Sequence, residues 1–153
     1  MAITNEPRTY RHWQRGTFLL AVLGGTGLAL VAFGLASQDL QIAVFVGVLL
    51  LLLAFLFHGL GVEVDESQVV VWLGPGWLRK RFGLDAIEEA RAVRNAWWMG
   101  WGIRYIGRGW MWNVSGLRAV ELQLRDGSVF RVGSDVPEEL SEVIEARKGE
   151  RGE

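Results

Sequence analysis

The chain has 153 residues, no cysteine, two histidines and a formal net charge of −1. Without cysteine it has no disulfide, no thiol nucleophile and no cysteine-ligated zinc or iron–sulfur site. Half of its residues are hydrophobic, and two long apolar runs near the start leave about ninety residues for one small core.

The two apolar runs, residues 17–36 and 40–60, contain no charged side chain. Each is about long enough to cross a bilayer as a helix, the only form in which an isolated segment satisfies its backbone groups in lipid. Because only residues 37–39 separate them, we expect an antiparallel two-helix transmembrane hairpin. A cleavable secretory signal is the alternative for the first run, but that run is longer than a usual signal core.

Arginines predict the orientation of this hairpin. Residues 1–16 form a basic tail with three arginines, the short loop has none, and Arg79, Lys80 and Arg81 follow the second run. Positive flanks stay on the cytoplasmic side, so we expect both termini in the cytoplasm and the chain in the inner cell membrane.

Small residues recur every four positions in both runs, as Ala21, Gly25 and Ala29 and as Ala43 and Gly47. Such stripes let helix backbones approach closely in lipid. The pattern leaves two readings open, packing within the hairpin and homodimerisation.

Short strands follow the second run, at 62–65, 68–73 and 77–82, separated by turn residues. Residues 84–94 favour helix and strand about equally, and 95–113 has no helical period, so we expect a loop and then strands near 103–106 and 110–113. Asp126-Gly127 predicts a type I′ hairpin turn between strands 119–124 and 129–132. A closing amphipathic helix begins near Val136-Pro137, capped by Ser134 or Asp135.

Four segments of the second half carry a resemblance: GWGIR at 100–104, NVSG at 113–116, VELQLRDGSVFRVGSD at 120–135 and PEEL at 137–140. Together, across residues 62–148, they resemble the bacterial pleckstrin-homology-like (PH-like) domain family, whose members often follow two transmembrane helices. The resemblance implies a seven-stranded sandwich capped by the C-terminal helix, with 89–94 as a strand. It implies no lipid-binding residue.

The expected architecture is therefore a transmembrane α-helical hairpin followed by a mainly-β PH-like sandwich or barrel that a C-terminal α-helix caps. Its parts are a cytoplasmic basic tail at 1–16, the hairpin at 17–61, the PH-like domain at 62–148 and a frayed tail at 149–153.

The tryptophans give the sharpest functional signal. Trp97, Trp98 and Trp101 share one glycine-broken loop, and tryptophan suits the headgroup region because its ring is apolar and its N–H is polar. Arg104 and Arg108 beside the loop are candidates for lipid phosphates. The alternatives are that the rings fill the core or form a protein interface, and that the arginines are ordinary solvated side chains.

Charge favours the same surface. Residues 77–118, which include Arg79, Lys80 and Arg81, carry eight basic and three acidic side chains, whereas 119–153 carry five basic and nine acidic ones. The basic middle is expected to face the anionic inner leaflet. Nucleic acid is the rival partner for a basic aromatic patch, but the acidic remainder of the domain and the tether to a membrane argue against it, so we expect no nucleic-acid partner.

Catalysis lacks its usual parts, since the soluble domain has no histidine and its carboxylates lie in turns and on an exposed helix face. We expect no enzyme, no cofactor and no metal site. His58 is interpreted as an interfacial neutral imidazole, with a proton relay as the alternative. The expected function is binding of the membrane surface or of a partner protein, and the alternative is a structural subunit that oligomerises through this domain.

Overall fold

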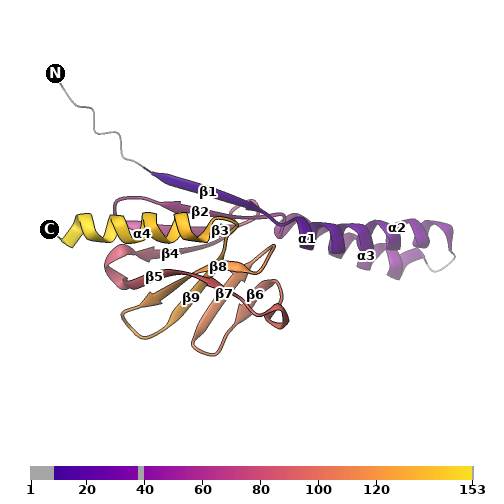
Figure 1. Ribbon diagram of the computed structural model, residues 1–153. Coiled ribbons are helices and arrows are strands. Elements are labelled where there is room, and N and C mark those ends of the chain that lie inside the picture. The colour runs from indigo at the N-terminus through magenta and orange to yellow at the C-terminus, as the bar shows by residue number, and fades with distance from the viewer. Residues whose placement is uncertain (1–8, 38–39, 153) are drawn as a thin grey trace, which may run out of the picture.

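The computed structural model describes residues 9–37 and 40–152. Residues 1–8 of the expected tail, 38–39 of the expected loop and residue 153 lie outside this description. Two apolar helices project side by side from one end of a two-sheet β-domain, and a C-terminal helix lies along that domain (Figure 1). The expected mainly-β domain with a closing helix is confirmed.

The first projecting helix is continuous from Thr17 to Ala36 and consists of three parts, α1 (Thr17–Leu19), the π-helical turn η1 (Leu20–Gly24) and α2 (Gly25–Ala36). Its 20 residues are long and apolar enough to cross a membrane. The returning helix, α3 (Leu40–Leu56), is apolar but has only 17 residues.

The two helices touch through glycines. A side chain at Gly27 would clash with the backbone oxygen of Gly47 at 2.9 Å, and one at Gly34 would meet the Cβ of Ala43 at 3.0 Å. The predicted stripe of the second helix therefore packs within the pair. The predicted stripe of the first helix, with Gly25 and Ala29, is exposed instead. The residues of α2 that face the second helix are Gly27 and Gly34, which are seven positions apart.

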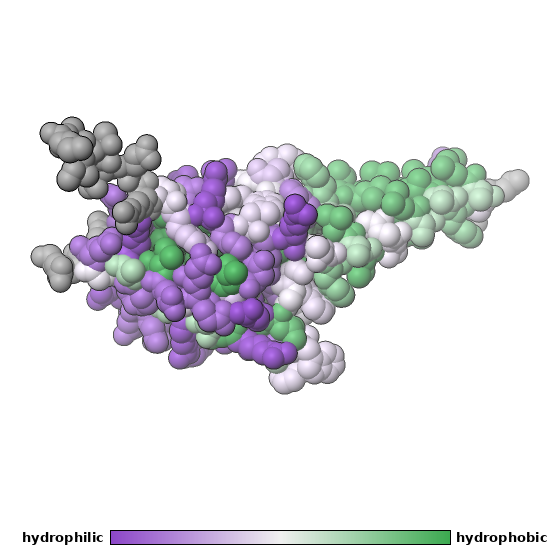
Figure 2. Space-filling view, turned by 45° about the horizontal axis from the view of Figure 1, so that its top comes forward, coloured by the Kyte–Doolittle hydropathy of each residue, from purple (hydrophilic) through white to green (hydrophobic). Residues whose placement is uncertain are grey.

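Most of the large side chains on the two helices have nothing to pack against. Leu35 is 71% exposed, Ile42 78% and Phe45 70%. Figure 2 shows the visible face of the pair as a continuous hydrophobic surface beside a largely hydrophilic domain. Exposed apolar surface of this extent marks a region that lipid or another protein covers.

The first sheet contains a strand that the sequence analysis missed. Strand β1 (Tyr10–Arg15) lies in the stretch predicted as tail and pairs antiparallel with β2 (Gly59–Val64), from Tyr10 opposite Val64 to Arg15 opposite Gly59. The helical pair is thus the connection of a β-hairpin, because two antiparallel helices return the chain beside its starting point. Strands β3 (Gln68–Leu73) and β4 (Leu78–Gly83) complete the sheet in the order β1-β2-β3-β4.

The predicted end of the second helix at residue 60 is wrong. The helix ends at Leu56, and Gly59 and Leu60 already belong to β2. The backbone N–H of Gly16 donates to the carbonyl of His58 at 2.8 Å, so the ladder between β1 and β2 continues to the helix ends. Gly59 is needed there, since a Cβ would lie 2.0 Å from the ring of Trp13.

The second sheet has the order β5-β8-β9-β7-β6. Its strands are β5 (Ile87–Arg94), β6 (Gly102–Tyr105), β7 (Gly109–Asn113), β8 (Arg118–Leu124) and β9 (Val129–Gly133), and the helical turns η2 (Leu84–Ala86) and η3 (Trp97–Met99) flank β5. The ambiguous segment 84–94 is therefore mostly strand. Strands β7 and β9 run parallel, and the described residues form nine strands, two more than the resemblance implies.

The turn between β8 and β9 is not type I′, because Gly127 has φ of +84° while no non-glycine residue in the described chain has positive φ. The N–H of Gly127 donates to the carbonyl of Leu124 at 2.9 Å, and the N–H of Leu124 donates to the carbonyl of Ser128 at 2.9 Å. This is a three-residue loop with glycine in the left-handed position.

Helix α4 (Pro137–Gly152) covers an edge of the second sheet. Leu140 and Ile144 are each 1% exposed and join the core that both sheets share. Glu145 accepts the N–H of Ala90 at 2.5 Å, and Lys148 donates to the carbonyl of Glu88 at 2.6 Å. The helix thus satisfies backbone groups that edge strand β5 would otherwise leave open.

Candidate membrane interface

One end of the sandwich gathers five segments at the helix roots, and we call it the helix-proximal end. It holds the junctions at Gly16 and Gly59, the turn 74–77, and the loops 95–101 and 114–117. The N–H of Gly74 donates to the carbonyl of Gly59 at 2.8 Å, and a Cβ on Gly16 would lie 3.2 Å from that of Val114. In Figure 1 the connection from β5 to β6 lies at this end.

Exposed tryptophans concentrate at this end. Trp77 is 78% exposed, Trp97 and Trp98 are each 72% exposed, and Trp13 is 38% exposed. Trp77 meets Phe55 of α3 edge-on at 6.4 Å between ring centroids. These rings come from β1, the turn before β4 and the loop after β5, so segments distant in sequence place tryptophan around the roots of the helices.

Trp101 differs from its neighbours because it is half-buried. Its ring packs against that of Phe18 of α1 in a tilted arrangement, with a centroid distance of 4.0 Å, and its Nε1 donates to the carbonyl of Gly116 at 3.0 Å. Trp101 therefore fastens the loop to the start of the first helix and leaves Trp97 and Trp98 to point outward.

An ion cluster around one buried carboxylate holds the other side of the loop. Glu121 of β8 is 2% exposed and accepts from the Nε of Arg91 at 3.0 Å and from the Nε of Arg131 at 2.7 Å. Arg131 also donates to Oδ1 of Asn95 at 3.1 Å and lies 3.8 Å from the sulfur of Met99. The tryptophan loop is thus anchored to the outer face of the second sheet through Asn95 and Met99.

The same cluster shifts the titration of Glu121. Burial opposes its ionisation, but the hydrogen bonds and charges of Arg91 and Arg131 together outweigh burial and hold the pKa of Glu121 below its usual value. The carboxylate is therefore ionised at neutral pH, which keeps both guanidinium groups in place.

Of the basic residues selected from sequence, Arg79 and Arg104 lie at the helix-proximal end. The Nε of Arg79 donates to the carbonyl of Gly76 at 2.9 Å, and the Nε of Arg104 donates to the carbonyl of Trp101 at 3.2 Å. Neither forms an ion pair with a residue in the described ranges, so their charge is available to an external anion.

The other selected cations lie elsewhere. Lys80 points inward, with its Nζ 5.0 Å from the ring centroid of Phe130, and Arg81 is exposed farther along β4. Arg108 lies in the turn between β6 and β7, at the opposite end of that hairpin. The structure thus brings Trp97, Trp98, Trp101, Arg79 and Arg104 together and leaves Lys80, Arg81 and Arg108 apart.

Sequence reasoning did not select Trp77, Arg15, Arg94 or Arg118 for this end. Arg15 ends β1, while Arg94 ends β5 directly opposite Arg118 at the start of β8. Only the strand pairing shows that these residues lie at this end, because it fixes which end of each strand faces the helices.

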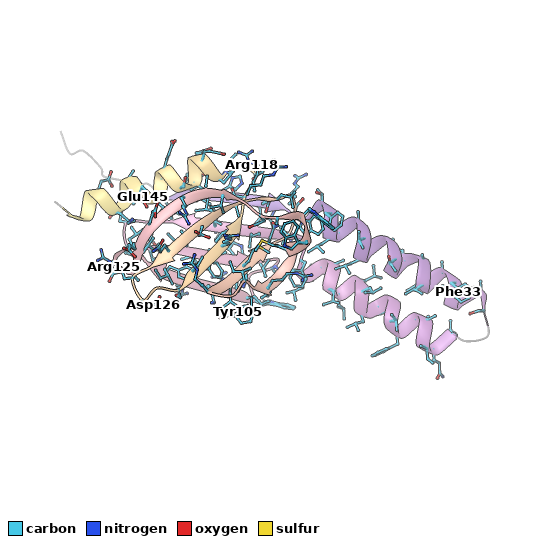
Figure 3. The ribbon with its side chains drawn as sticks, turned by 60° about the horizontal axis from the view of Figure 1, so that its bottom comes forward. Phe33, Tyr105, Arg118, Arg125, Asp126 and Glu145 are labelled. Atoms are coloured by element: carbon cyan, nitrogen blue, oxygen red, sulfur yellow. The ribbon has the colours of Figure 1, made fainter. Side chains whose placement is uncertain are left out.

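The opposite end of the sandwich carries acidic turns. Asp65 and Asp126 each accept from the N–H and hydroxyl of a serine two residues later. These bonds lower the pKa of Asp126, and at Asp65 burial opposes ionisation but the hydrogen bonds from Ser67 and Gln68 together outweigh it and lower the pKa as well. Figure 3 shows Arg125 and Asp126 at the far end of the sandwich from the helical pair, whose tip carries Phe33.

Histidine and carboxylate groups do not converge on a metal site among the described residues. His58 follows α3, where its Nδ1 lies 2.6 Å from the carbonyl oxygen of Phe55 and its ring lies 5.5 Å from that of Trp13. It belongs to the aromatic group at the helix roots.

Models of known protein families give no match to the chain, and no curated protein is significantly similar to it. The resemblance to the bacterial PH-like family therefore stays a prediction. At the helix-proximal end, exposed tryptophans lie near the roots of two exposed apolar helices, together with Arg79 and Arg104, which have no ion-pair partner among the described residues.

Proposed function

We propose that this chain is a non-enzymatic integral membrane protein whose two apolar helices span the inner membrane and hold the helix-proximal end of the β-domain against the bilayer surface. The observation that carries the proposal is the position of Trp13, Trp77, Trp97 and Trp98 around the helix roots. At that level the rings lie among lipid headgroups, the environment that tryptophan prefers.

Electrostatics supports the same face. Arg79 and Arg104 lie beside the tryptophans without carboxylate partners among the described residues, while Asp65 and Asp126 lie at the far end. Near an anionic leaflet each basic side chain contributes about 1 kcal/mol. The pairing of β1 with β2 on either side of the helical pair supports a topology in which both hairpin ends lie on one side of the membrane, and the arginine bias favours the cytoplasm as that side.

Quenching of tryptophan fluorescence by brominated lipid tests the contact. The full chain is placed in nanodiscs whose phosphatidylcholine carries bromine at a shallow acyl position. Replacing Trp97 and Trp98 by Phe is expected to lower the quenched fraction, because two emitters near bromine are lost. The matched control, Trp110→Phe, removes a ring that is also exposed but lies on β7 away from the helix roots. It should raise the quenched fraction, and equal effects of both changes would overturn the proposal.

A second candidate function, that of a subunit in a membrane assembly, has one observation in its favour. Edge strand β6 leaves Ile103 36% and Tyr105 64% exposed, and Tyr105 meets the 45% exposed Trp110 edge-on at 5.6 Å. Native mass spectrometry of the full chain separates the readings. A stable oligomer that Tyr105→Ser dissociates would favour the assembly, and a monomer would exclude homo-oligomerisation through this edge.

A further inference from the structure

Strand β4 leaves one edge of the first sheet open. It is the last strand in the order β1-β2-β3-β4, and no strand of the described chain pairs with its outer edge. An open edge presents a row of unpaired backbone N–H and C=O groups that can pair with an added strand. At β5, an end strand of the second sheet, Glu145 and Lys148 of α4 bind such groups instead. The first sheet can therefore grow by one strand at β4.

The second sheet covers the inner side of β4 only in part. Leu73 of β3 is 0% exposed, whereas its partner in β4, Leu78, is 36% exposed. The ring of Phe82 lies 4.7 Å from that of Phe130 between centroids, so β4 lies over β9. The second sheet continues past β9 with β7 and β6. Its last two strands therefore extend beyond the edge of β4.

The inner face of these two strands carries exposed apolar side chains, and we call Ile103, Tyr105 and Trp110 the aromatic shelf. Phe130, Trp110 and Tyr105 pair in turn across β9, β7 and β6, so they share one face of the sheet. Their exposed fractions rise from 2% through 45% to 64% with distance from β9. Figure 3 shows Tyr105 at the margin of the domain. Because neighbouring strands lie about 4.8 Å apart, the shelf is wide enough for the inward side chains of one added strand.

Three consecutive cations restrict what β4 can accept. Arg79 and Arg81 are exposed on the outer face of the first sheet, and Lys80 points inward over the ring of Phe130. None of the three forms an ion pair with a residue in the described ranges. Cations on an edge strand disfavour pairing with apolar or basic strands. A strand that brings carboxylates opposite them remains favourable, and the exposed aromatic shelf offers its other side chains an apolar surface.

A second copy of this chain does not offer such a strand at the ends of its own sheets. Three of the end strands within the described residues, β1 (YRHWQR), β4 (LRKRFG) and β6 (GIRY), contain no carboxylate. The fourth, β5, carries Glu88 and Glu89, but α4 covers its edge. An acidic strand at β4 would therefore come from a different protein.

We propose that β4 binds an extended acidic segment of a partner protein as a fifth strand of the first sheet. Its carboxylates would lie at Arg79 and Arg81, and its inward side chains would lie on the aromatic shelf. Backbone pairing supplies affinity in this mode of recognition, and the side chains supply specificity. Because Arg81 lies beyond the helix-proximal end, binding there does not require the tryptophan loop to touch lipid. A partner held at β4 would be held at the membrane through the two apolar helices.

Fluorescence anisotropy of labelled peptides, added to the full chain in phosphatidylcholine nanodiscs, tests the proposal. The probe alternates glutamate and valine. One control alternates lysine and valine, and a second is the glutamate peptide methylated at every backbone nitrogen, which keeps the charge but removes the backbone donors. We expect the probe to bind about tenfold more tightly than either control. Equal binding of the methylated peptide would mean attraction by charge alone and would overturn the proposal.

Two arginine variants form a matched pair. Arg81→Glu reverses a charge on β4 and should weaken binding of the glutamate peptide about tenfold. Arg125→Glu makes the same change at an exposed arginine in the turn between β8 and β9, and should leave binding unchanged. Arg81→Glu should also strengthen binding of the lysine peptide, a gain that damage to the fold does not produce. Equal effects of the two variants on the glutamate peptide would contradict the site.

Hydrogen exchange measured by mass spectrometry locates the added strand. The glutamate peptide should slow exchange in residues 78–83 and leave residues 102–105 unchanged, because only β4 gains backbone partners. Protection of β6 in place of β4 would overturn the proposal. Protection of β4 that rises with the concentration of the chain alone would assign the edge to a second copy and overturn the assignment to a different protein. Absence of peptide binding, combined with lipid quenching that depends on Trp97 and Trp98, would remove the strand site and leave the proposed membrane contact in place.

Discussion

At the scale of the residue, the turn between β8 and β9 depends on Gly127, whose φ is +84°. A Cβ there would meet no neighbour, so the cost of Gly127→Val is backbone strain alone, about 1 kcal/mol or more of unfolding free energy. Chemical denaturation of the full chain in detergent measures it. The control is Gly149→Val in α4, also open but with ordinary φ, which should be close to neutral. An unchanged midpoint for Gly127→Val would refute the turn geometry.

From the lowered pKa of Glu121 we expect the domain to lose stability in acid. Its pKa is lowered in the folded protein, so its ionised form stabilises the fold above the unfolded pKa, about 4.3, and that contribution is lost as pH falls through the folded pKa. Glu121→Gln should destabilise the domain at pH 7 and flatten the fall in melting temperature between about pH 5 and 3. Parallel pH profiles for the two proteins would show that the cluster of Arg91, Glu121 and Arg131 does not govern acid stability.

At the scale of the element, strand β1 joins the helical pair to the β-domain from both sides, because β1 precedes the two helices and pairs with β2, which follows them. Deleting residues 1–15 removes the partner of β2 and exposes the edge of that strand. The cooperative unfolding transition should then be lost, or its melting temperature should fall by several degrees. A loss of about 1 kcal/mol of unfolding free energy lowers the melting temperature of a domain of this size by about 4 °C or more. Deleting residues 1–8 keeps all of β1 and is the control. A domain that melts equally well without β1 would show that the first strand is dispensable.

Local signals predicted the apolar helices, the hairpin near Gly127 and helix α4, because each is encoded in one continuous stretch of the chain, whereas the turn type of the hairpin and the end of the second helix were predicted wrongly. Strand β1 could not be predicted this way, since its sequence YRHWQR is mostly polar and its partner lies beyond both helices. The Trp97 and Trp98 cluster was visible as composition. Its relation to Trp77 and Arg118 depends on which end of each strand faces the helices, and only the strand pairing fixes that.

At the scale of the whole molecule, the cysteine-free sequence allows topology to be read with single thiols. Ala36→Cys, at the exposed last position of α2, should react with a membrane-impermeant maleimide added to intact cells. Ser128→Cys, in the turn between β8 and β9, should react only after the membrane is opened. The reverse pattern would place the β-domain outside the cytoplasm, against the arginine bias.

The most direct measurement of the contact between domain and bilayer uses two spin labels on the full chain in nanodiscs. One label replaces Trp98 at the helix-proximal end, and the other replaces Arg125 at the far end of the sandwich (Figure 3). Oxygen concentrates in lipid and a nickel chelate stays in water. The ratio of the rates at which the two reagents collide with a spin label therefore reports the depth of that label in the bilayer. The label at position 98 should collide mainly with oxygen and the label at 125 mainly with nickel. Equal exposure of both labels to nickel would mean that the tryptophan loop stays in water, and the proposed membrane interface would be wrong.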